Sequence, residues 1–271
     1  MDYGPWGITT LLYSKRGTEI YSTSDVRWVL KAVDDEQRSL DELRVILAIY
    51  YKRPRYAIAL PPSLYGLYGR TPNTGWYALK RYAGHVELDP YCKERWRTLA
   101  IHVLQFLQDF HHDHGLLHMD IKRANILIDR ERQAFVVADY EHADRPSTTL
   151  TTSYTDSYKW YYMAMGAELD QPLLSWRLDL VALGYLVASL TVEKSAWTFE
   201  QACWDKRDGS GLPSEEVVGL RLQELANVDS TVLAYLEHIK EVDWSAKEPP
   251  ARSFYVELEE LFKVRKPPLR S

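Results

Sequence analysis

The chain reads His118-Met119-Asp120-Ile121-Lys122-Arg123-Ala124-Asn125 and continues into the aliphatic run Ile126-Leu127-Ile128. The polar residues form the pattern H-x-D-x-K-x-x-N. A match to four fixed residues beside an aliphatic run rarely arises by chance. The plainest interpretation is a surface loop between a helix and a strand. The alternative is a functional loop that carries a carboxylate, an ammonium group and an amide, and the rest of the chain decides between the two.

Length and composition indicate a folded protein with one large domain or two lobes. The chain has 271 residues, of which 46% are hydrophobic and 26% are charged, and this length allows sizeable cores. The net charge of -5 favours neither nucleic acid nor an anionic membrane. Cys92 and Cys203 form no paired motif. Because we find no signal peptide and no membrane-spanning run, we expect a cytoplasmic or nuclear protein with no nucleic-acid or membrane partner.

Residues 1–82 are expected to form a small β-rich lobe with one helix. Strand-like patterns occur in four stretches, at residues 8–13, 26–33, 56–60 and 76–82. The first two are separated by a turn near Gly17. Residues 34–51 have helical character, and the spacing of Ser39 and Glu42 suggests a capping box.

Residues 83–271 are expected to form a larger helical lobe. Pro90 to His112 reads as one long amphipathic helix, a short strand follows at 134–138, and the Thr- and Ser-rich stretch 148–157 reads as an exposed loop. Further helices are predicted at 177–191, 214–226, 229–241 and 253–264. The sequence therefore predicts an α+β protein with a β-rich lobe before an α-helical lobe.

Three charged residues outside the loop are candidates for the same site. Asp139 follows an apolar strand, Lys31 ends the strand Trp28-Val29-Leu30-Lys31, and Glu42 lies in the helix after that strand, with Glu36 as a rival. Each has an ordinary structural interpretation as a turn or surface residue. Four histidines at 111, 112, 114 and 118 lack a neighbouring cysteine. We expect them to end a helix rather than to bind a transition metal, with His118 supporting the loop backbone.

The N-terminus contains Gly4-Pro5-Trp6-Gly7, which looks like the second half of a glycine-rich phosphate loop. Glycines let backbone amides approach phosphates closely. The first glycine of such a loop is missing, because Asp2 stands there. We therefore expect the first strand of the lobe to be short or absent.

The glycine motif, Lys31, Glu42, the loop at 118–125 and Asp139 follow one another along the chain as the motifs of protein kinases do. The chain therefore resembles the eukaryotic protein-kinase superfamily over nearly its whole length. The nearest branch is similar to the casein-kinase-one and vaccinia-related kinases. The similarity to that branch lies in residues 77–84, which resemble its hinge, in Ser175 to Tyr185, and in residues 235–244 with Phe254 and Tyr255. A bilobal kinase fold is what this resemblance implies.

The resemblance implies a serine/threonine protein kinase that uses ATP and Mg²⁺. It assigns Asp120 as catalytic base, Lys122 to the transferring phosphoryl group, and Asn125 and Asp139 to the metal. Lys31, paired with Glu42, would hold the phosphates of ATP. Gly4 and Gly7 would cover the phosphates, and adenine would lie against Leu79 to Tyr82, including Arg81. The protein substrate cannot be identified from the sequence.

Two further motifs are expected to have structural roles. Asp179, in a D-x-x-x-L-G pattern, would hold the backbone of the catalytic loop. Residues 163–168 look like a degraded A-P-E motif, and Glu168 would pair with Arg252.

Three departures from the kinase pattern leave alternatives open. Met119 replaces an Arg that binds activation-loop phosphate, Tyr140-Glu141 replaces Phe-Gly after Asp139, and the glycine-rich loop is incomplete. Glu141 could bind a metal or repel ATP. The chain could therefore be a kinase-like binding protein, or a small-molecule phosphotransferase of the aminoglycoside or choline type. Lys122 favours a protein kinase acting on Ser or Thr.

Overall fold

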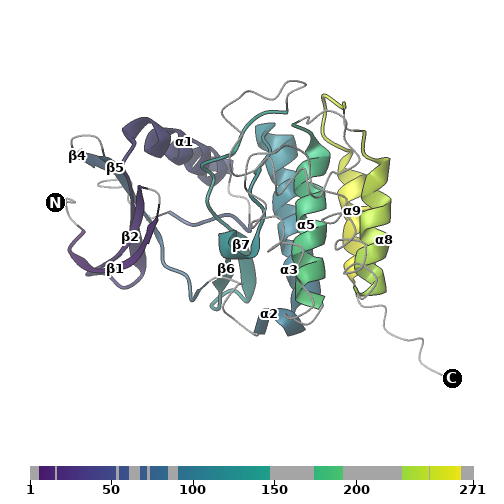
Figure 1. Cartoon of the computed structure of the whole chain (residues 1–271), viewed down its shortest axis with the longest axis horizontal. Coiled ribbons are helices and arrows are strands. Elements are labelled where there is room, and N and C mark those ends of the chain that lie inside the picture. The colour runs from purple at the N-terminus through teal and green to yellow at the C-terminus, as the bar shows by residue number, and fades with distance from the viewer. Residues whose placement is uncertain are drawn as a thin grey trace, which may run out of the picture.

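The computed structural model describes residues 6–15, 17–52, 55–60, 68–71, 74–84, 91–146, 174–191, 228–243 and 245–263. The expected α+β architecture is confirmed. An antiparallel sheet with one helix lies at one end of the molecule, and a group of helices lies at the other (Figure 1). The predicted loop 148–157 and the predicted helix 214–226 lie outside the described residues.

The N-terminal sheet has five antiparallel strands in the order β1-β2-β3-β5-β4. They are β1 (Ile8–Lys15), β2 (Thr18–Thr23), β3 (Trp28–Val33), β4 (Tyr68–Thr71) and β5 (Thr74–Lys80). The strand predicted at 8–13 is confirmed as β1, which pairs along its length with β2. The strand expected to be short or absent before Gly4 would lie outside the described residues. The sequence patterns missed β2 and β4, since β2 is rich in polar residues and β4 is short and contains a glycine, features that weaken a strand signal.

The predicted strand at 56–60 is wrong. Only Ala57 makes a single isolated bridge, to Val137, and the amide of Val137 donates to Tyr56 O at 3.0 Å. Ala57, Ile58 and Leu60 are buried, so their apolar character reflects packing against the C-terminal lobe. Residues 55–60, which we call the linker, lie between α1 and β4 in the sequence and pack against the C-terminal lobe instead of extending the sheet.

Helix α1 (Glu36–Lys52) covers one face of the sheet. The predicted capping box is wrong, because Ser39 and Glu42 both lie inside the helix and are buried. The helix start is instead held by Asp35, whose Oδ1 accepts a hydrogen bond from the Arg38 amide at 3.0 Å, as a side-chain cap does. Leu43, Ile46 and Ile49 form the buried stripe of α1.

The C-terminal part combines a short hairpin with helices. The hairpin is β6 (Ile126–Asp129) with β7 (Ala134–Val137), and the helices are α2 (Tyr91–Glu94), α3 (Trp96–Asp109), α5 (Trp176–Thr191), α8 (Ser230–His238) and α9 (Arg252–Phe262). The single helix predicted for 90–112 is interrupted at Arg95 and ends in a π-helical turn, Phe110–His114. Among the described helices, none combines the length and apolar character that a membrane crossing requires.

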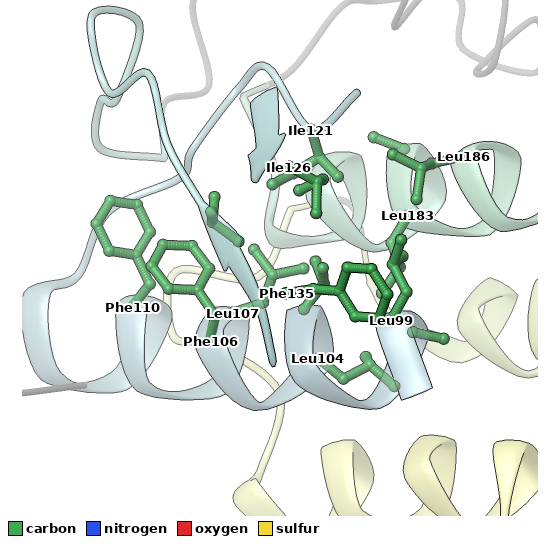
Figure 2. Packing of buried hydrophobic residues seen from close by; sticks show 14 of the residues in the cluster. Leu99, Leu104, Phe106, Leu107, Phe110, Ile121, Ile126, Phe135, Leu183 and Leu186 are labelled. Carbon is green, nitrogen blue, oxygen red and sulfur yellow. The ribbon is translucent and has the colours of Figure 1, made fainter. Parts of the chain in front are cut away.

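Helix α3 is at the centre of the core. Figure 2 shows Leu99, Phe106 and Leu107 of α3 gathered with Phe135 of β7 and with side chains of α5. The named residues of α3 and β7 are each at most 1% exposed. This core holds the loop between α3 and β6, which contains Asp120, on a rigid base.

We predict that Gly184→Val destabilises the fold. A Cβ at Gly184 would lie 2.5 Å from Leu236 Cδ2 and 3.0 Å from a ring carbon of buried Tyr235, so α5 and α8 would have to separate. Overpacking of this kind costs about 1–3 kcal/mol, measured as the free energy of unfolding in urea. Val256→Ala, at an exposed position of α9, is the control and should leave stability unchanged. An unaltered midpoint for Gly184→Val would contradict the close packing of α5 on α8.

Candidate active site

The loop at 118–125 is anchored by a buried carboxylate. Asp179, in the first turn of α5, accepts hydrogen bonds from the amides of His118 at 2.7 Å and Met119 at 2.9 Å. Met119 has a φ of 67°, a conformation that a non-glycine residue keeps only when its surroundings enforce it. The predicted structural role of Asp179 is confirmed.

Two histidines extend this anchor. His111 Nε2 lies 3.0 Å from Asp179 Oδ2, and its Nδ1 lies 2.6 Å from Tyr255 OH. Because the carboxylate can only accept, Nε2 carries the proton and Nδ1 accepts from the tyrosine. His118 joins its own loop to Ala138 O at 3.2 Å, and burial lowers its pKa to about 4. The expected role of His118 in supporting the loop is confirmed.

Two side chains at the end of the loop, those of Lys122 and Asn125, converge on one carboxylate oxygen of Asp120. Asp120 Oδ2 lies 2.6 Å from Lys122 Nζ and 2.6 Å from Asn125 Nδ2. Burial raises the pKa of Asp120 to about 6, although Lys122 lowers it. Because Oδ2 already has two donors, Oδ1 is the oxygen left to accept a proton.

Lys31 of β3 joins the two lobes. Its Nζ lies 2.9 and 2.8 Å from the two oxygens of Glu42, on α1, and 2.7 Å from Asp139 Oδ1. Burial by itself would lower the pKa of Lys31, but the charges of Asp139 and Glu42 outweigh burial and raise it. The structure therefore brings these three predicted residues together and selects Glu42 over Glu36 as the partner of Lys31.

Asp139 follows β7 in a left-handed conformation, with a φ of 68°. The next amide, that of Tyr140, donates to Glu42 Oε1 at 3.2 Å, and the amide of Ala138 donates to Asn125 O at 2.9 Å. Burial would raise the pKa of Asp139, but Lys31 outweighs burial and lowers it. The backbone on both sides of Asp139 is thus fixed, and the carboxylate is held ionised beside Lys31.

The substitution of Glu141 for glycine is compensated within the structure. Glu141 Oε2 accepts from Arg38 Nε at 3.0 Å, and Oε1 lies 2.7 Å from His142 Nε2. Arg38 also donates to Thr18 Oγ1 at 3.1 Å. Burial would raise the pKa of Glu141, but the hydrogen bond from His142 and the charge of Lys31 outweigh it and hold the pKa below its usual range.

The sequence analysis missed Arg38 and His142. The signal for Arg38 was its position one helical turn before Glu42, which puts both side chains on the same face of α1. His142 directly follows Glu141, so its contact could be inferred only once the loop conformation was known.

The structure does not bring Gly7 to this site. The carbonyl of Gly7 accepts from the amide of Ser24 at 2.6 Å, at the end of the sheet where β2 turns into β3. The turn that connects β1 to β2 is at Gly17, whose φ is 77° and whose missing side chain leaves room for Asp34. The assignment of Gly7 to the phosphates stays a prediction that these contacts do not support, and Gly4 lies outside the described residues.

Leu79 and Arg81 lie where β5 leads into the C-terminal lobe. Leu79 is buried, and the Arg81 amide donates to Arg27 O at 2.7 Å. Between them, Lys80 Nζ lies 3.2 Å from Asp129 and 3.0 Å from Glu131. These ion pairs tie the end of the sheet to the β6–β7 hairpin.

The predicted pairing of Glu168 with Arg252 cannot be followed, because Glu168 lies outside the described residues. Arg252 contacts two carboxylates of the α3 end, Asp109 at 3.2 Å and Asp113 at 2.8 Å. Arg252 therefore links the start of α9 to the turn that leads into the catalytic loop.

One oxygen-rich group of the described residues could hold a metal ion. Carboxylate oxygens of Glu42, Asp139 and Glu141 lie within 4.8 Å of one another. Lys31 engages both oxygens of Glu42, and Arg38 and His142 engage those of Glu141. Asp139, with only Oδ1 bound to Lys31, is therefore the freest ligand. The amide oxygen of Asn125 adds another donor, because its Nδ2 is used by Asp120. Hard oxygen donors of this kind suit Mg²⁺.

We predict measurable energetic coupling between Arg38 and Glu141. Because Glu141 is only 15% exposed, Arg38→Gln leaves a partly buried carboxylate with fewer partners. In a double-mutant cycle with Glu141→Gln, urea unfolding should give a coupling of about 1 kcal/mol. The control cycle uses Lys240→Gln and Glu237→Gln, an exposed pair with a single contact at the end of α8, which should show little coupling. Additive effects at Arg38 and Glu141 would refute the link.

Comparison with known proteins agrees with this site. The model of the protein kinase domain family matches residues 80–242, more than half of the chain. A search of curated proteins found no match. The matched region contains Asp120, Asn125 and Asp139, and the structure adds Lys31 and Glu42 from the lobe before it. The chain belongs to the protein kinase domain family.

Proposed function

We propose that this protein is a serine/threonine protein kinase that transfers the γ-phosphate of Mg-ATP to a protein hydroxyl. The observation that carries the proposal is the ion pair of buried Lys31 with both Glu42 and Asp139, at 2.7–2.9 Å. A working kinase needs its β3 lysine, α-helical glutamate and metal-binding aspartate aligned. ATP would bind between the lobes, near Leu79 and Arg81.

The residues fit a magnesium ion at Asp139 and Asn125, with Glu141 within reach. When bound with ATP, the ion would offset negative charge on the phosphates. Lys31 would then be shared between Glu42 and the nucleotide. Because Arg38 and His142 already engage Glu141, the negative charge added by this residue is partly offset, and it does not by itself exclude a triphosphate.

Asp120 would act as the base toward the substrate hydroxyl. Its Oδ1 would receive the proton while Oδ2 stays held by Lys122 and Asn125, so the carboxylate keeps its orientation through the reaction. Lys122, at 32% exposure, would reach the transferring phosphoryl group. The presence of Lys at this position supports Ser or Thr as the acceptor, and the casein-kinase-one and vaccinia-related branch stays a prediction.

Two observations favour other functions of the same site. The β1–β2 turn holds one glycine instead of a glycine-rich loop, which favours a kinase-like binding protein with weak ATP use. The position of Glu141 beside Asp139 favours a small-molecule phosphotransferase. A kinase-like binding protein and a small-molecule phosphotransferase would each behave differently from a protein kinase in assays of ATP binding and phosphate transfer.

We expect Mg-ATP to raise the melting temperature of the full chain, as a ligand of the folded state does, and the protein to transfer labelled γ-phosphate to protein substrates. Asp120→Asn should reduce transfer by about 10²–10⁴-fold with nucleotide binding kept, whereas Lys31→Met should weaken both. Asp41→Asn, an exposed carboxylate on α1, is the matched control and should retain activity. Absence of nucleotide binding at millimolar ATP would exclude both the protein kinase and the small-molecule phosphotransferase. Transfer to hydroxylated metabolites but not to proteins would favour the phosphotransferase.

We expect the pH profile of phosphoryl transfer to report Asp120. Because its pKa is raised to about 6 in the free protein and only the carboxylate accepts a proton, kcat/KM should fall as the pH drops through about 6. The Lys122 ammonium lowers this pKa, so Lys122→Met should move the acidic limb to higher pH as well as reduce kcat. An acidic limb that stays in place in Lys122→Met would contradict the assignment to Asp120.

A further inference from the structure

A pocket lies at the junction of the two lobes, and none of the candidate catalytic residues lines it. Its volume is about 590 Å³. The walls come from the end of α1 and the linker at 55–59, from His102 on α3, and from the β6–β7 turn at 132–134. The pocket therefore spans both lobes and is formed by segments to which the kinase site gives no role.

The rim of this pocket carries unbalanced positive charge. Arg55 comes from the linker and Arg132 from the β6–β7 turn, and both line the pocket. Arg55 makes no ion pair with any residue in the described part of the chain. Among the described residues, Arg132 pairs only with Asp129, at 3.9 Å, and Lys80 already holds that carboxylate at 3.2 Å. Two guanidinium groups thus face the pocket in a chain whose net charge is -5.

The floor of the pocket is aromatic and uncharged. The rings of Tyr56 and His102 stack at 4.2 Å with an interplanar angle of 14°. Phe135 donates its amide to His102 Nδ1 at 3.1 Å, so the proton is on Nε2. Burial, together with the charges of Arg95 and Arg55, lowers the pKa of His102 to about 4. The neutral ring therefore offers an apolar face and a hydrogen-bond donor, but no positive charge of its own.

We propose that this pocket is a docking site for an acidic peptide segment of a partner protein. An apolar side chain of the peptide would rest on the Tyr56–His102 platform, and its flanking carboxylates would reach Arg55 and Arg132. A platform between two guanidinium groups from different segments fits an extended chain better than a single small anion, because one anion would leave the aromatic floor uncovered. The inference stands apart from the proposed phosphotransfer, since binding here needs neither ATP nor Asp120.

The test is fluorescence anisotropy with the full chain and no nucleotide. The probe is a short fluorescein-labelled peptide in which aspartates and glutamates flank a central leucine. We expect saturable binding by the unaltered protein, and affinity at least about tenfold lower in Arg55→Glu and in Arg132→Glu, because each reversal repels a carboxylate. A peptide with alanine in place of leucine should bind more weakly to the unaltered protein.

The matched control is Arg44→Glu, an exposed arginine of α1 outside the pocket, which should keep the unaltered affinity. An equal loss in this variant would indicate attraction by overall charge and overturn the site. Absence of binding by the acidic peptide, or displacement of it by inorganic phosphate at equal concentration, would also overturn the proposal. Asp120→Asn should bind the peptide unchanged, so failure of phosphotransfer and failure of docking are distinguishable.

Discussion

The buried ammonium of Lys31 imposes the strongest single constraint on this structure. A charge removed from water is tolerated only when opposite charges and hydrogen bonds surround it. Here those partners come from two other elements, Glu42 on α1 and Asp139 after β7. The sheet, α1 and the C-terminal lobe must therefore meet at one point. Loss of one carboxylate would leave the ammonium poorly compensated, so the same contact serves both stability and the alignment of the candidate site.

A second buried network holds the other half of the site by the same principle. Asp179 receives two backbone amides and the His111 ring, and these donors lower its pKa against the opposing effect of burial. Tyr255 extends the network to α9 through His111. The C-terminal helix is thus connected to the backbone of the catalytic loop through three hydrogen-bonded side chains. This explains how α9 could affect Asp120 without touching it.

Sequence patterns predicted the residues that carry charge at fixed spacings, and they failed where spacing is set by tertiary contacts. Lys31, Glu42 and Asp139 were recognised because each stands beside a clear strand or helix. The stretch 56–60 was misassigned because burial against another lobe gives the same apolar pattern as a strand. Ser39 and Glu42 have the spacing of a capping box, but both are buried inside α1 and do not cap its start. The β1–β2 turn at Gly17 was not considered as the phosphate loop because β2, with its polar residues, was not recognised, so the count of strands before Lys31 was wrong.

Glu141 shows how one departure from a family pattern is accommodated by its neighbours. Arg38 and Glu42 lie one turn apart on the same face of α1, and each holds a charged partner outside the helix. One partner is Lys31 and the other is Glu141, two residues after Asp139. Rotation of α1 about its axis would break the Glu42–Lys31 and Arg38–Glu141 ion pairs together. With glycine at position 141, only the Glu42–Lys31 pair would be present. The second pair therefore restrains α1 relative to the metal-binding loop through contacts of this chain alone, in a protein where Met119 supplies no arginine to bind a phosphate.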